Sequence, residues 1–173
     1  MLNITKWFKH TVLASVVCII PITSVAATSF LATDQPFITI EDEHDRSEAW
    51  GTCVAAYNLM AMIQAETSPS MSKLLSQKAN GAKIALSMDY FLGQDSDASS
   101  DQMSARLKMG KVLMESISET QLTGMLARGE LLKHNDEWFT LVTNTLATCT
   151  DNTDQQQSLI NLWRELYASG AFE

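Results

Sequence analysis

Apolar side chains recur at helical spacing along most of this chain, and that period constrains its fold more than any other feature. The first run places them three and four residues apart, on one face of a helix; its members are Trp50, Cys53, Val54, Tyr57, Met60 and Ala61. Similar runs follow toward the C-terminus, and no strand-length alternation of apolar and polar residues occurs after residue 40. We therefore expect an all-α fold, a single-domain bundle of four to five helices.

Breaking and capping residues divide these helices from one another. The first helix is expected to run to about Glu66, and Pro69 suits the first position of the second helix. Gly93 is placed to end that second helix. The third helix is long and is expected to kink or break around Gly124, and Asn135 is predicted to cap the fourth.

The N-terminal residues have the pattern of a cleaved signal peptide. Lys6 and Lys9 form a positively charged start, and the apolar run over residues 11–22 is too short to span a bilayer. Small residues at positions 25–27 suit cleavage at that point. This pattern predicts a periplasmic or secreted protein with no stable membrane anchor after cleavage.

The sequence predicts three parts, of which the first is removed by cleavage. They are a signal peptide over residues 1–27, an extended lead-in over 28–40 and a helical domain over 41–173. The leader takes two lysines with it, so the 12 basic and 20 acidic residues of the full chain become 10 and 20, a formal charge of −10. That balance argues against nucleic acid and anionic membranes as partners. It permits a basic protein or peptide as a partner, although an acidic surface more often serves solubility, and it leaves the oligomeric state open.

Two of the three cysteines, Cys53 and Cys149, lie beyond the leader. Disulfides persist in the compartment that the leader predicts. Redox-active pairs usually have a C-x-x-C spacing, whereas these two cysteines are 96 positions apart. We therefore predict a structural disulfide between the first helix and the end of the fourth.

The stretch EDEHDRSEAWGTC, residues 41–53, invites a metal site because His44 and Glu48 are one helical turn apart. Zinc usually takes several nitrogen or sulfur ligands. Beyond the leader the chain has only two histidines, His44 and His134, and both cysteines are assigned to the disulfide. The carboxylates are better explained as the first turn of a helix, where the macrodipole favours negative charge. We therefore predict no metal site.

No cofactor and no catalytic residue is predicted either. The C-x-x-C-H motif of covalent haem attachment is absent, which leaves a non-covalent haem held by methionine and His134 as the alternative. The motifs of nucleophilic, metal-dependent and phosphate-binding enzymes are also absent. A hydrolase using two carboxylates, such as Glu48 and Glu115, stays open as an alternative.

Methionine is the other unusual feature, with eight residues beyond the leader. Most of them have the spacing of a buried helical face, which favours a role in core packing. Exposed methionines would instead form an adaptable surface for partners.

Two short segments contain the cysteines, Trp50-Gly51-Thr52-Cys53 and Ala147-Thr148-Cys149-Thr150. The second segment is followed by a predicted polar helix that contains Trp163. Over about twenty residues they resemble the HdeA-type periplasmic acid-stress chaperones, which are small helical proteins with one disulfide. The interval between the cysteines is far longer here than in that family. The resemblance implies a holdase as one candidate function.

These observations favour a secreted or periplasmic helical protein with a non-enzymatic protein-binding role, as an inhibitor, immunity protein or stress chaperone. The alternative is a periplasmic carrier of a ligand, metal or haem. A further alternative is a hydrolase without a recognisable motif.

Overall fold

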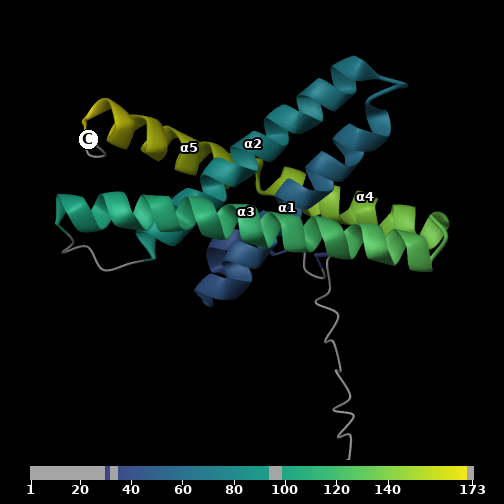
Figure 1. The fold of residues 1–173 in the computed structure, drawn as a ribbon, viewed down its shortest axis with the longest axis horizontal. Coiled ribbons are helices and arrows are strands. Elements are labelled where there is room, and N and C mark those ends of the chain that lie inside the picture. Colours follow the sequence, from purple (N-terminus) through teal and green to yellow (C-terminus); the bar gives the residue numbers. More distant parts are fainter. Residues whose placement is uncertain (1–29, 32–34, 94–98, 171–173) are drawn as a thin grey trace, which may run out of the picture.

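The computed structural model describes residues 30–31, 35–93 and 99–170, and these residues form an all-α domain without strands (Figure 1). The predicted signal peptide lies outside them. The described elements are η1 (Phe37–Thr39), α1 (Glu43–Gln64), α2 (Pro69–Leu92), α3 (Ser100–Leu131), α4 (Asp136–Asp151) and α5 (Thr153–Ala168). The prediction of a single-domain bundle of four to five helices is confirmed. None of the described helices combines the length and the apolar character that crossing a membrane requires.

Most helix boundaries fall where the sequence predicts them. Pro69 is the first residue of α2, Gly93 follows its last residue, and the Asn135 side chain accepts a hydrogen bond from the backbone N–H of Trp138 at the start of α4. The prediction of a kink or break near Gly124 is wrong, since α3 continues without interruption from Ser100 to Leu131. A glycine inside a helix costs only about 1 kcal/mol relative to alanine, so it need not end a helix that packs along its length.

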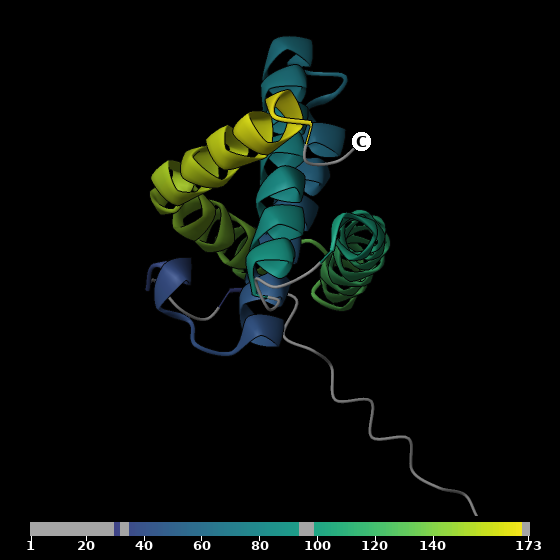
Figure 2. The same cartoon turned by 90° about the vertical axis from the view of Figure 1, so that its left-hand side faces the viewer.

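The helices form three layers. In Figure 2 the α1–α2 hairpin stands in the middle, α3 lies end-on along one side, and α4 and α5 lie along the other. The contacts agree with this view, because α1 packs against α2, α3 and α4, while α5 packs mainly against α2.

The central helix α1 is buried on nearly all sides. Every residue from Ala49 to Tyr57 is buried, although the sequence pattern indicated a single apolar face. Small residues explain the difference. A Cβ atom at Gly51 would overlap Cγ2 of Ile117 in α3, so the absence of a side chain lets these two helices approach closely.

The described part of the lead-in, residues 30–31 and 35–40, packs on the bundle. Phe37 is fully buried, its ring meets that of Trp50 edge-on with centroids 4.8 Å apart, and its N–H donates to Oδ1 of the buried Asn152 at 2.8 Å. The segment is not extended throughout, because η1 forms a turn within it. Pro36 starts this turn with φ at −60°, and its carbonyl accepts the N–H of Thr39.

Cys53 in α1 and Cys149 in α4 lie at disulfide distance, with Cα atoms 5.6 Å apart and both side chains buried. The pair joins the first helix to the end of the fourth, as the sequence predicts. A second contact holds the start of α4, where Trp138 Nε1–H donates to the carbonyl of Met125 in α3 at 3.0 Å.

Candidate functional site

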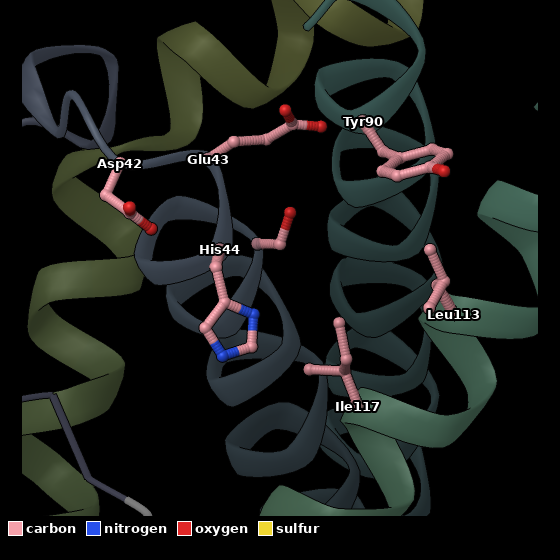
Figure 3. Close-up of a pocket in the computed structure, with 7 residues that line it drawn as sticks. Asp42, Glu43, His44, Tyr90, Leu113 and Ile117 are labelled. Carbon is pink, nitrogen blue, oxygen red and sulfur yellow. The ribbon is translucent and has the colours of Figure 1, made fainter. Parts of the chain in front are cut away.

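An open cleft of about 340 Å³ lies at the N-terminal end of α1, where this helix meets the end of α2 and the middle of α3. Figure 3 shows Glu43 extending toward Tyr90 along one edge, with His44 and Ile117 along the opposite edge. The described residues that line the cleft are Asp42, Glu43, His44, Ser47, Tyr90, Leu113 and Ile117. The cleft therefore joins the carboxylate-rich start of α1 to an apolar wall from α3.

The carboxylates at this end have helix-start positions. Asp42 is the N-cap of α1, and its side chain accepts a hydrogen bond from the backbone N–H of Asp45 at 2.9 Å. Glu43 and Asp45 occupy the first turn, where the positive end of the helix dipole stabilises negative charge. The structure thus agrees with the interpretation of this stretch as an acidic helix start.

Arg46 in α1 connects two of the elements beside the cleft, α2 and the lead-in. Arg46 Nε–H donates to both carboxylate oxygens of Asp89 near the end of α2, at 2.8 and 2.7 Å. Its Nη1 donates to the carbonyl of Ile40 at 2.8 Å, which ties the lead-in to the same point. Hydrogen bonds between ionised groups are shorter and stronger than neutral ones. Arg46 therefore fixes α1, α2 and the lead-in relative to one another.

Burial raises the pKa of Asp89 above its ordinary value of 3.8, the hydrogen bond and charge of Arg46 oppose that rise, and the charge of Glu43 adds to it. The charges of Arg46 and Glu43 thus act on the Asp89 carboxylate in opposite directions. This end of the molecule keeps an excess of negative charge beside the cleft.

The structure brings together some of the residues considered for a metal, haem or carboxylate site. His44 Nε2 lies 3.4 Å from Glu48 Oε1, but the His44 side chain is 75% exposed. Within residues 30–31, 35–93 and 99–170, no three His, Cys, Asp or Glu side chains are grouped as a metal would require. Glu115 lines a different cleft, to which Glu48 does not contribute. His134 lies in the α3–α4 turn, where its ring packs edge-on against Trp138.

The methionines are divided between core and surface. Met88, Met114 and Met125 are buried, in agreement with the core-packing interpretation. Met109 is 52% exposed and lies one helical turn before Leu113, so it continues the apolar wall of the cleft onto the surface of α3. Val112, also in α3, is 61% exposed. This exposed strip was not predicted from the sequence.

Sequence reasoning also missed Tyr90, Leu113 and Ile117, whose apolar spacing makes them look like ordinary core positions. Asp89 could have been found, because a carboxylate flanked by Met88 and Tyr90 in an apolar run needs a partner when it is buried. Which arginine supplies that partner depends on the fold.

The fold and cleft define an all-α domain in which a central hairpin is covered by helices on both sides and carries an acidic cleft at one end. No protein-family model matches this chain, and no significant match was found among curated proteins or solved structures.

Proposed function

We propose that this protein has a non-enzymatic binding role in the periplasm or outside the cell, and that its acidic cleft receives a lysine or arginine side chain of a basic protein. The observation that carries this proposal is that one open cleft is lined both by the Glu43 carboxylate and by the aliphatic side chains of Leu113 and Ile117. Long basic side chains place their methylene groups against apolar surface and their charge against an acidic rim.

The exposed strip beside the cleft favours a macromolecular partner over a small cation. Met109 and Val112 add exposed apolar surface next to the wall formed by Leu113 and Ile117. A single bound side chain would not cover this additional surface. Methionine adapts its shape to varied partners and is enriched at protein interfaces. The formal charge of −10 expected after cleavage would also speed the approach of a basic partner at low salt.

The experiment is affinity capture from a cell-envelope extract at low and moderate salt, followed by titration calorimetry with the captured protein. The test variant is Glu43→Gln/Asp45→Asn, which removes two charges from the first turn of α1 and keeps the Asp42 cap. The matched control is Asp136→Asn/Glu137→Gln, which removes two charges from the first turn of α4. Both variants lose similar helix-dipole stabilisation.

We expect the α1 variant to weaken binding by about tenfold or more, the scale of a hydrogen bond to a charged group, and the α4 variant to bind normally. Rising salt should weaken the wild-type complex, since exposed charges are screened. Met109→Gln should also weaken it, whereas Met71→Gln, at an exposed methionine in α2, should not. A partner absent at both salt concentrations, or one equally sensitive to the α4 variant, would refute the proposal.

A further inference from the structure

A second cleft, of about 230 Å³, lies where α3 meets α1 and α2, and its lining differs entirely from that of the acidic cleft. The four contributions from α3 are spaced at i, i+3, i+4 and i+7, so they form one stripe along the helix. The lining residues are Asn58 from α1, Lys83 from α2, and Glu115, Ser118, Glu119 and Leu122 from α3.

The polar side chains of this cleft have no partner among the residues that the structure describes. Within the described part of the chain, none of the five makes a side-chain hydrogen bond or an ion pair. Ser118 is the most buried of them, only 7% exposed, and its Oγ has no hydrogen-bond partner. Buried polar groups are nearly always satisfied in folded proteins. A bound molecule would explain why these groups converge.

The charges of the lining define the chemistry of that molecule. Glu115 and Glu119 are like charges one turn apart on α3, an unfavourable pairing that a cation between them would relieve. Lys83 faces the same cleft from α2, and its ammonium disfavours a metal ion there and calls for an anionic group. The complementary ligand carries one positive and one negative charge.

We propose that this cleft binds a free α-amino acid in its zwitterionic form. The ligand carboxylate pairs with Lys83, and the ligand ammonium lies between Glu115 and Glu119. The Ser118 hydroxyl hydrogen-bonds to the ligand head group, and the amino-acid side chain lies against Leu122. The cleft is smaller than the 300 Å³ or more typical of drug-sized ligands, which suits a molecule of this size. This proposal does not depend on the protein-binding role of the acidic cleft.

The test is titration calorimetry of the purified protein with L-amino acids of each side-chain class at millimolar concentrations. For the best ligand, the carboxamide form removes the carboxylate and the N-acetyl form removes the ammonium. We expect each of these changes to weaken binding by about tenfold or more, since each removes a charge-assisted hydrogen bond. Failure of every amino acid to bind would overturn the proposal, and so would either blocked form binding as tightly as the unmodified amino acid.

Variants assign the binding to this cleft. Lys83→Met and Glu119→Gln should each weaken binding about tenfold or more, and Lys83→Arg should retain most of it. The controls Lys73→Met and Glu130→Gln, at exposed positions of α2 and α3, should bind as the wild type does. Equal losses in the controls would place the ligand elsewhere. Circular dichroism checks each fold, and if Lys83→Met fails to fold, the blocked ligands on wild-type protein still decide the question.

Discussion

Reducing the bond between Cys53 and Cys149 should destabilise this protein more than any single surface substitution. The two residues are 96 positions apart and connect α1 to α4. In the chain-entropy model, a cross-link closing a loop of this length stabilises the fold by about 4.7 kcal/mol at 25 °C, by restricting the unfolded chain. A typical domain is stable by only about 5–15 kcal/mol, so the expected loss is a large share of the total.

Apart from the disulfide, α4 is held by a few buried side chains, among them Trp138 and Val142. Its contacts with α1 and α5 are sparse compared with those between α1 and α2, and a hydrogen bond from Trp138 holds its first turn to α3. Both cysteines are buried, so replacing them with alanine adds the cost of small cavities to the loss of the cross-link. The double variant Cys53→Ala/Cys149→Ala should therefore be slightly less stable than the reduced wild type.

The assay is urea unfolding of the oxidised protein, the reduced protein and the double alanine variant, followed by far-UV circular dichroism. The free energy of unfolding should fall by about 4–5 kcal/mol on reduction, and the intact mass should rise by two hydrogens. A loss below about 1 kcal/mol would refute the reasoning, as would two free thiols in protein prepared under oxidising conditions.

Three further predictions concern packing, ionisation and the lead-in. Gly51→Ala should destabilise the fold by about 1–3 kcal/mol, because the new Cβ overlaps the β-branched side chain of Ile117, which has little freedom to move. In the control Gly81→Ala, the new Cβ overlaps only the flexible end of Gln156, so the free energy of unfolding should change by less than about 0.5 kcal/mol. Because burial raises the pKa of Asp89, the folded state holds its proton more tightly than the unfolded state, so the wild type should lose stability relative to Asp89→Asn as the pH rises from 3.8 through the raised pKa. Asn152→Ala should cost about 2 kcal/mol, because it leaves the buried N–H of Phe37 without an acceptor.

Each of these outcomes has a measurement that could contradict it. Urea unfolding compares the two glycine variants, and equal stabilities would mean that α1 and α3 can separate without cost. The same assay from pH 3 to 7 compares the wild type with Asp89→Asn. If the wild type became more stable relative to this variant as the pH rises, Arg46 would lower the pKa of Asp89 by more than burial raises it. Asn161→Ala, at an exposed asparagine of α5, is the control for Asn152→Ala. Equal losses of stability in those two variants would show that the hydrogen bond from Phe37 to Asn152 does not account for the effect.

Much of the fold could be predicted because helices are specified locally. Pro69, Gly93 and Asn135 act on the backbone beside them, so their positions predict where α2 and α4 begin or end. Gly124 shows the limit of such reasoning, because its local cost is small and α3 continues through it.

The acidic cleft could be predicted only in part. Its carboxylates are contiguous in the sequence, so the charged start of α1 was evident. Tyr90 and Leu113 reach the cleft from α2 and α3, and nothing in their local pattern separates them from core residues. The same limit applies to Ser118, because its lack of a hydrogen-bond partner among the described residues depends on how the surrounding helices place their side chains.

The sequence by itself determined the helices and predicted the pairing of Cys53 with Cys149, because helical hydrogen bonds are local and only two cysteines lie beyond the predicted signal peptide. Tertiary structure decided which faces are covered. The small residues Gly51, Ala55 and Ala56 allow neighbouring helices to surround α1, although they carry little hydrophobic signal of their own. Both clefts arise where three helices meet, and that geometry depends on side-chain volumes from distant parts of the chain, which no local pattern contains.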